Sequence, residues 1–437
     1  CTPHYSSAAA VTGMISETAQ TTFSFNNSVT RIHEDPRVTK PFSDADWTAI
    51  RALGYKVDED LLAGDVRMTM GGEPTFVSID DMEAAEWNTD ALGAHKRERA
   101  GDLVKRLRTA FAPHAMLHYG QGKQYPGEPL PRWQLGIFWR KDNIPMWRDQ
   151  SLEAEDGKKY NLTTQDAERF ARGIAKHLGI QDYTVPAYED LFYFLWEQEK
   201  LPTNLDPLIA DFKDSLERQR LQELLKNGIE EPVGYVLPCA WDDEAHCFRS
   251  TPWHFRRNHL FLVPGNSPVG LRLPLASIPW EDPKKRRITP ERDQFAEERT
   301  IPDYAEDSHS SLDIGHLSSS KRQTNALMTN DQSTNDLFTA RTALCVEVRD
   351  DMMHVFYPPL THLEHYAELT AAIEATAREL NIPVRIEGYE PPRDPQLVRL
   401  LVTPDPGVIE VNIHPASSWE ELLHITETLY AEARLAR

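Results

Sequence analysis

The sequence predicts an α+β fold in which helices flank a mainly antiparallel sheet. Two observations point to this class. Segments in which apolar and polar residues alternate recur in the last hundred residues, and Asp350-Asp351 separates two of them as a predicted hairpin turn. Amphipathic segments with capping residues lie between these strands and earlier in the chain.

The composition is that of a globular protein with a substantial core. Of 437 residues, 40% are hydrophobic and 26% are charged, and 68 Asp and Glu against 47 Lys and Arg give a formal charge of −21. This acidic excess excludes a general nucleic-acid binder, which needs basic residues to displace phosphate counterions. No apolar run approaches the roughly 18 residues of a membrane span. Four cysteines and no signal peptide predict a reducing, cytoplasmic setting.

The first part of the chain predicts helices and strands in alternation. Helices are predicted over 43–53, 95–111, 165–178 and 206–226, and strands over 66–76, 132–140, 260–263 and 271–275. Ser43, with Asp46 three residues later, has the pattern of a helix N-cap. Thr164 is a candidate cap for the helix over 165–178, and Gly179 is its expected end.

The last hundred residues give the clearest pattern. Strands are predicted over 344–349, 354–357, 382–386 and 408–414, and helices over 363–380 and from Ser417 or Ser418 onward. Before them, residues 283–335 are rich in Ser, Asp, Asn, Glu and Thr and contain few aromatic residues. This composition predicts a mobile or disordered insertion.

The strand over 408–414 carries the sharpest chemical signal. Its apolar residues alternate with Glu410, Asn412 and His414, which predicts that these three side chains share one face of a sheet. Glu347 and Glu387 hold equivalent polar positions in two other predicted strands.

Glu73 lies on a fourth candidate strand, so that one sheet face could present four carboxylates. Converging carboxylates repel one another unless cations lie between them, and hard divalent ions, Mg²⁺ above all, suit oxygen ligands. The alternative is a sheet face exposed to water, where Glu and Lys are common. The scarcity of Lys opposite these glutamates favours the metal hypothesis.

Two further segments offer charges for an anion. Glycines and Lys123 in the loop 118–128 could bind a phosphate, although the segment is not a Walker A loop and could be an ordinary turn. Arg272, in an apolar segment, could be a buried ion-pair partner or a clamp for phosphate or carboxylate. Zinc is disfavoured because seven residues separate Cys239 from Cys247.

Four motifs together resemble one bacterial family, the amidoligase domain that follows a transglutaminase-like domain in large proteins. They are Gly71–Ser78, His118–Trp133, Pro264–Leu275 and Val408–Pro415. The resemblance covers about 43–437. It implies that 1–42 end a transglutaminase-like domain, and that 43–282 and 336–437 form an amidoligase domain interrupted by 283–335. Family members continue past this end into a Gly-rich segment with a His. We therefore expect a chain truncated at the C-terminus, which could be inactive in isolation.

The family is similar to carboxylate–amine ligases of the glutamate–cysteine ligase and glutamine synthetase type. The resemblance implies a curved antiparallel sheet that binds ATP and Mg²⁺. It also implies activation of a small-molecule or peptide carboxylate as an acyl phosphate, which an amine attacks to give an amide. The adjacent transglutaminase-like domain is the expected protein partner.

The resemblance also assigns roles to individual residues. Metal ligands are expected at Glu73, Glu347, Glu387 and Glu410, catalytic groups at Glu73, Glu410 and His414, and cofactor contacts at Lys123, Arg272 and Asn412. Two alternatives stay open: a non-catalytic scaffold or peptide-binding module, and a metal-dependent amide hydrolase that works without ATP.

Overall fold

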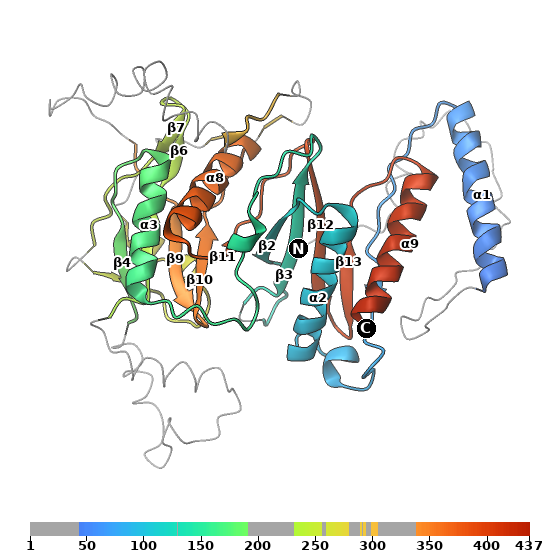
Figure 1. The fold of residues 1–437 in the computed structure, drawn as a ribbon, viewed down its shortest axis with the longest axis horizontal. Helices are drawn as coiled ribbons and strands as arrows, with labels where there is room; N and C mark the ends of the chain where they lie inside the picture. The colour runs from blue at the N-terminus through green and yellow to red at the C-terminus, as the bar shows by residue number, and fades with distance from the viewer. Residues whose placement is uncertain are drawn as a thin grey trace, which may run out of the picture.

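The structure is a computed structural model that describes residues 43–128, 130–190, 231–255, 259–278, 289–290, 292–293, 299–304 and 338–437. Its centre is one sheet of eleven strands (Figure 1). In spatial order these are β1 (Thr75–Phe76), β13 (Val408–Asn412), β12 (Leu397–Asp405), β3 (Trp133–Arg140), β2 (Met116–Gln121), β11 (Val384–Gly388), β10 (Met352–Tyr357), β9 (Ala343–Arg349), β5 (Gly234–Pro238), β4 (Val185–Tyr188) and β8 (Leu260–Phe261). Only the pairs β2–β11, β10–β11 and β4–β8 of this sheet are parallel. The predicted α+β class and mainly antiparallel sheet are confirmed.

Five α-helices accompany the sheet within the described ranges. They are α1 (Asp44–Ala63), α2 (Ala94–Phe111), α3 (Thr164–Leu178), α8 (Leu363–Leu380) and α9 (Trp419–Ala436). A separate hairpin is formed by β6 (Ala240–Asp242) and β7 (Cys247–Arg249). Among the described helices, none is both long and apolar enough to cross a membrane.

The two pairs of helices that flank the sheet cover opposite faces of its two halves. Adjacent residues of β3 show this, because Ile137 packs in the core beneath α2 and α9, whereas Phe138 packs in the core beneath α3 and α8. Figure 1 shows α3 and α8 over the β9–β11 half and α2 and α9 over the β12–β13 half. In each half, therefore, the second face of the sheet is free of these long helices.

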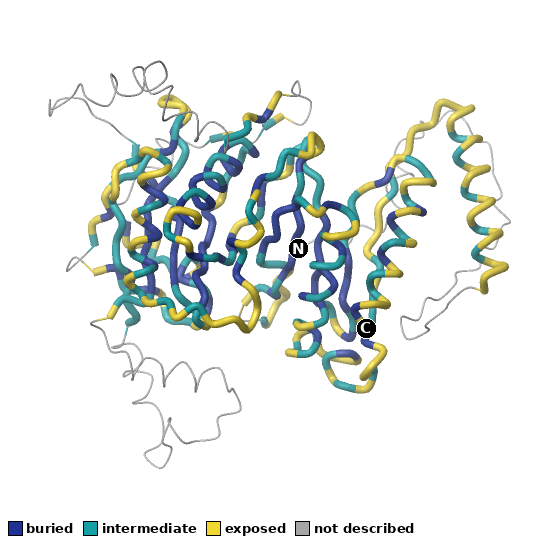
Figure 2. Tube along the Cα trace, in the orientation of Figure 1, coloured by how far each residue is buried: buried dark blue, intermediate teal, exposed yellow. Residues whose placement is uncertain are grey.

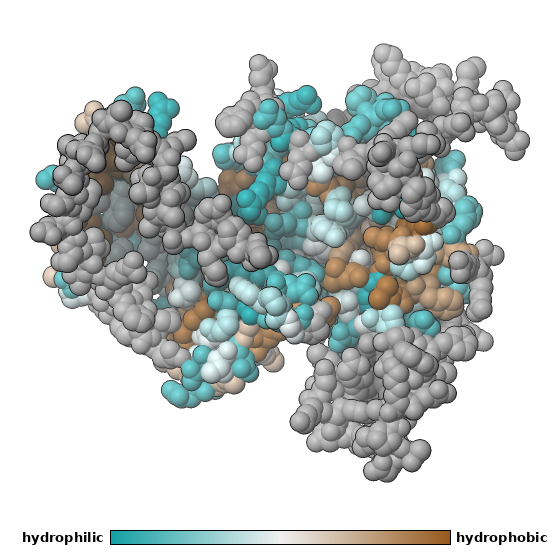
Figure 3. All heavy atoms as spheres, turned by 180° about the vertical axis from the view of Figure 1, so that it is seen from behind, coloured by the Kyte–Doolittle hydropathy of each residue, from teal (hydrophilic) through white to brown (hydrophobic). Residues whose placement is uncertain are grey.

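Burial follows this plan. The strands of the sheet are buried along most of their length, while α1 stands at one end and contains no buried residue (Figure 2). Seen from behind, hydrophilic residues occupy the central surface, and hydrophobic residues gather at the side where β4, β5 and β9 lie (Figure 3). Three exposed apolar side chains on the segment after β8 are Val263, Leu271 and Leu275.

Several sequence predictions about local structure are confirmed. Ser43 and Asp46 form a reciprocal capping box at the start of α1, as their spacing predicts. Gly179 ends α3 in the left-handed conformation. Asp350 and Asp351 both have positive φ, as a two-residue hairpin turn between β9 and β10 requires.

Other predictions are wrong or incomplete. The strand over 66–76 reduces to Thr75–Phe76 with an isolated bridge at Met70. The segment 271–275 is not a strand, since short 3₁₀ turns lie at Val269–Leu271 and Leu275–Ser277 and prolines flank them. The cap of α3 is Thr163 rather than Thr164.

Some strands have no counterpart in the sequence prediction. β12, an interior strand of the sheet, has no predicted counterpart, and β2 runs from Met116 to Gln121, into the loop predicted over 118–128. The predicted helix over 206–226 lies outside the described residues, as does most of 283–335. One described residue of this second segment is packed: Ile301 is buried in the core beneath α3 and α8.

Candidate functional site

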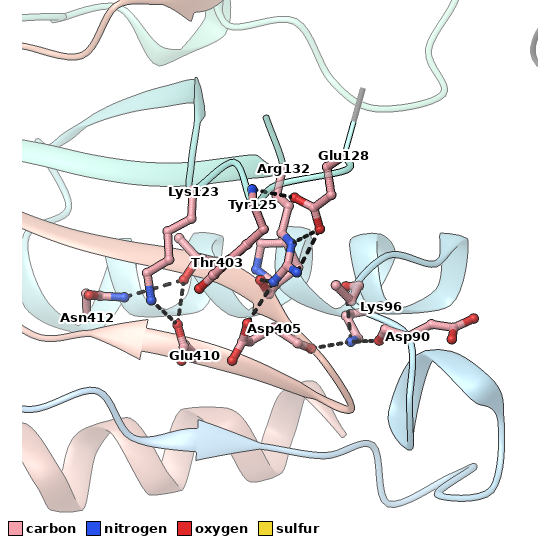
Figure 4. A network of polar contacts seen from close by, with 12 residues as sticks. Asp90, Lys96, Lys123, Tyr125, Glu128, Arg132, Thr403, Asp405, Glu410 and Asn412 are labelled. Atoms are coloured by element: carbon pink, nitrogen blue, oxygen red, sulfur yellow. Dashed lines mark hydrogen bonds and ion pairs between the residues drawn. The ribbon is translucent and has the colours of Figure 1, made fainter. Parts of the chain in front are cut away.

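The four predicted glutamates form two separate groups, and the first lies on β13 (Figure 4). Lys123, which follows β2, places its Nζ 3.2 Å from Glu410 Oε2. Thr403 on the neighbouring β12 lies opposite Glu410, with its Oγ1 3.5 Å from the same carboxylate oxygen. The amide of Asn412 donates to Thr403 Oγ1 at 3.4 Å. The segment after β2 and the β12–β13 hairpin, which are distant in sequence, thus meet at one polar site.

Glu73 belongs to this first group through the register of β1. Thr75 lies opposite Glu410, and the N–H of Ile413 donates to the carbonyl of Gly72, which places Glu73 opposite Asn412. Partial burial acts to lower the pKa of Lys123, but the hydrogen bond and charge of Glu410, with the charge of Glu73, raise it above its ordinary value. The charged form of Lys123 is therefore favoured by both carboxylates, and Glu410 contacts it directly.

A hairpin between β2 and β3 positions Lys123. Backbone N–H groups of Gly122 and Arg132 donate across it to the carbonyls of Arg132 and Lys123. The buried Arg132 binds Glu128 at 2.8 Å within the hairpin and Asp405 at 2.7 Å at the end of β12. These two ion pairs fasten the hairpin to the strand that carries Thr403.

The second group of glutamates is buried on β9 and β11. Arg349 donates to both carboxylates, with Nη1 2.8 Å from Glu347 Oε1 and Nη2 2.6 Å from Glu387 Oε2. His354 Nδ1 lies 3.0 Å from Glu387 Oε2. The backbone N–H of Val269 donates to Glu347 Oε1 at 3.0 Å. The motif Pro264–Leu275 therefore closes over this cluster.

The two carboxyl groups of this cluster respond differently to their surroundings. Burial raises the pKa of Glu347, and the charge of Arg349 does not overcome this effect. Burial also acts on Glu387, but the hydrogen bond from His354 and the charge of Arg349 outweigh it and lower its pKa to about 2. Glu387 is thus the carboxylate of this cluster whose charged form is stabilised, by His354 and Arg349 together.

The two groups do not converge, which corrects the expectation of four carboxylates on one face. Val411 packs beneath α2 and α9, so its neighbour Glu410 points to the other face of the sheet. Glu387 lies in register with Tyr119, which packs on the α2 and α9 side. Glu410 and Glu387 also stand on strands four positions apart, or about 19 Å at the usual strand spacing. Paired catalytic metals lie only about 4 Å apart.

The chemistry of the donors decides which group suits a metal. The Glu410 group offers only oxygen donors, from two carboxylates, a hydroxyl and an amide, which suits a hard cation such as Mg²⁺. Glu347 and Glu387 instead share the guanidinium of Arg349, and Glu387 also lies 3.0 Å from His354 Nδ1. In the described part of the chain, no cluster of three or more His, Cys, Asp or Glu could hold a metal ion. Mg²⁺ usually needs only one or two carboxylates when substrate phosphates complete its coordination.

His414 lies apart from Glu410, against the prediction that both share a face. Its ring packs edge-on against Phe111 of α2 and Trp139 of β3, with centroids 5.5 and 5.4 Å away. β13 ends at Asn412, so strict alternation no longer applies two residues later. Burial lowers the pKa of His414. His414 is thus a half-buried ring packed between aromatic side chains rather than a partner of Glu410.

Arg272 is an ion-pair partner within its own part of the fold. Its Nη1 donates to Glu189 at 2.7 Å and to the carbonyl of Gly265 at 2.7 Å. The side chain is 7% exposed and lies on the segment that covers Glu347. Of the two alternatives left open by the sequence, the structure favours the buried ion-pair partner.

Sequence reasoning missed several polar residues of both groups. Thr403 was missed together with β12, whose alternating residues could have shown its position. Arg349 lies two residues after Glu347 on β9, and His354 lies opposite Glu347 on β10, so alternation could have identified both. Arg132 was placed at the start of a strand, but nothing local indicates its partner Asp405.

The family of the chain follows from a comparison with family models. The model described as "Putative amidoligase enzyme (DUF2126)" matches residues 17–437. The chain belongs to this family. No curated protein and no solved structure matched the chain. Membership in this amidoligase family confirms the resemblance carried by the four motifs, and the match begins before the boundary expected near residue 43. The link to a transglutaminase-like domain stays a prediction.

Proposed function

We propose that the chain is a carboxylate–amine ligase that uses ATP and Mg²⁺ and forms an amide. Family membership supports amide formation. The single observation that carries the nucleotide proposal is the contact of Lys123 with Glu410, 287 positions later in the sequence. In the proposal, Lys123 would bind phosphate and the adjacent Glu410 would bind Mg²⁺, which is the pairing that phosphoryl transfer needs.

In this proposal Glu73 and Glu410 would hold the Mg²⁺, with Asn412 and Thr403 as further oxygen donors. The bound ion supplies positive charge against the phosphate oxygens. Lys123 would neutralise the phosphate that transfers. The chain's own contribution is to fix these charges near the edge of the sheet and on the braced β2–β3 hairpin, where they favour the charge that develops during transfer.

The proposed reaction has two steps. A carboxylate oxygen of the first substrate attacks the γ-phosphorus of ATP, and the bond to the bridging oxygen breaks to release ADP. The nitrogen lone pair of the amine then attacks the carbonyl carbon of the acyl phosphate. Inorganic phosphate leaves with the electrons of the C–O bond, and the nitrogen loses a proton to give the amide.

Trapping of the activated carboxylate tests this function. The full chain is incubated with Mg·ATP, hydroxylamine and a panel of amino acids and small carboxylates, and hydroxamate and ADP are measured. We expect both products with at least one carboxylate and neither in the Glu410→Gln variant. Glu379→Gln, an exposed glutamate on α8, is the control and should retain activity. Absence of nucleotide binding would leave the scaffold alternative, and amide cleavage without ATP would establish the hydrolase alternative.

A further inference from the structure

Tyr125 presents an open aromatic face next to the polar site. Its ring lies over the guanidinium of Arg132, with 4.4 Å between the ring centroid and Cζ. The residue is 42% exposed even though one side of its ring is covered. Figure 4 shows Tyr125 between Lys123 and Arg132.

The ring is held in place rather than loosely exposed. The N–H of Tyr125 donates to Glu128 Oε2 at 3.0 Å, and the N–H of Glu128 donates back to the carbonyl of Tyr125 at 3.1 Å. Gly127, with φ of 95°, provides the positive φ of this tight turn. Arg132 is only 8% exposed and is fixed by its ion pairs with Glu128 and Asp405. The platform is therefore preorganised, which lowers the entropic cost of stacking.

The position of the ring relative to Lys123 suits a nucleotide. The two residues are separated by a single residue in the hairpin, about 7 Å for extended backbone. Lys123 in turn contacts Glu410 at 3.2 Å. A triphosphate that lies at Lys123 and Glu410 would therefore have its base within reach of Tyr125. Bases of every kind stack on aromatic side chains, and an underlying Arg adds a cation–π contribution.

We infer that Tyr125, backed by Arg132, is the platform on which the base of the nucleotide stacks. The inference rests on the proposed function and adds a base-binding subsite to it. It requires that the base gains affinity by stacking on the aromatic ring of Tyr125 and not by a hydrogen bond to the Tyr125 hydroxyl. Stacking of one base is worth about tenfold or more in affinity.

Calorimetric titration of the full chain tests the inference with two probes, Mg·ATP and Mg·tripolyphosphate. We expect Tyr125→Leu to weaken Mg·ATP about tenfold and to leave Mg·tripolyphosphate unchanged, whereas Tyr125→Phe keeps both affinities. Tyr125 is exposed, so both variants should melt at the wild-type temperature. Equal binding of Mg·ATP by Tyr125→Leu and wild type would overturn the inference alone. Failure of the folded wild type to bind either probe would overturn it together with the proposed function.

Discussion

Arg349 is the most informative residue for the stability of the fold, because it lies between two buried carboxylates. Arg349→Met keeps the aliphatic stem and removes the charge, so Glu347 and Glu387 lose their shared partner. Both hydrogen bonds, at 2.8 and 2.6 Å, join charged groups, and such bonds are worth about 1.5–3 kcal/mol each. Because the Arg349 side chain is 31% exposed, we expect a loss near the lower end of this sum, about 3 kcal/mol.

The pKa of Glu387 shows how much the ionised carboxylate stabilises the fold through His354 and Arg349 together. A carboxyl with a folded pKa of about 2 and an ordinary value of 4.5 stabilises the fold by about 3 kcal/mol at neutral pH. Because the folded pKa is depressed, this contribution is fully present above pH 4.5 and disappears as the pH falls toward 2. In Arg349→Met the pKa of Glu387 rises, so the variant loses less stability than the wild type on acidification.

Urea unfolding of the wild type and Arg349→Met at pH 7 and at pH 3.5 measures both effects. We expect a difference of about 3 kcal/mol at pH 7 that narrows at the lower pH. Arg169→Met is the control, because Arg169 pairs with Asp166 at an exposed position and should lose less than about 0.5 kcal/mol. A difference below about 1 kcal/mol at pH 7, or one that does not change with pH, would refute the reasoning.

Three further changes test other parts of the structure. Burial lowers the pKa of Lys96 to about 8, so above pH 8 the unfolded state binds more protons than the folded state. Urea unfolding should therefore show the wild type gaining free energy of unfolding relative to Lys96→Met between pH 8 and 10. A difference in free energy that stays constant over this range would contradict the prediction. Lys123→Met removes the cation that pairs with Glu410, so calorimetric titration should show that Mn²⁺ alone binds more tightly and Mg·ATP more weakly than to the wild type. If both affinities rise or both fall, Lys123 is not the phosphate-binding cation. A Cβ at Gly54 would lie 2.0 Å from the ring of Trp419, so Gly54→Ala should separate α1 from α9 and speed amide hydrogen exchange in α1. This is expected despite the higher helix propensity of Ala. Unchanged exchange would show that α1 does not depend on this contact.

The sequence could predict elements and their local faces, but not how separate strands share a face. Capping residues located α1 and α9, and alternation correctly separated Glu410 from Ile409 within β13. Alternation says nothing of the relation between β13 and β11, because strand order and register are long-range properties. Glu387 therefore turned out to lie on the opposite face from Glu410.

The contacts that define the candidate site are long-range for the same reason. Lys123, beyond the end of β2, reaches Glu410 across β3 and β12, and β12 itself has no predicted counterpart. Arg132 likewise pairs with Asp405, which lies 273 residues later in the sequence. Family motifs marked the segments that carry Lys123 and Glu410, but only the sheet order shows that these two residues touch and that Arg272 belongs elsewhere.

Binding of a non-hydrolysable Mg·ATP analogue to the wild type, Glu410→Gln and Glu387→Gln tests the central claim most directly. The claim is that nucleotide and metal bind at the Glu410 group and not at the buried cluster around Arg349. Titration calorimetry on folded samples should show Glu410→Gln at least about tenfold weaker than wild type and Glu387→Gln within about twofold of it. Normal binding by Glu410→Gln, or loss of binding confined to Glu387→Gln, would contradict the account.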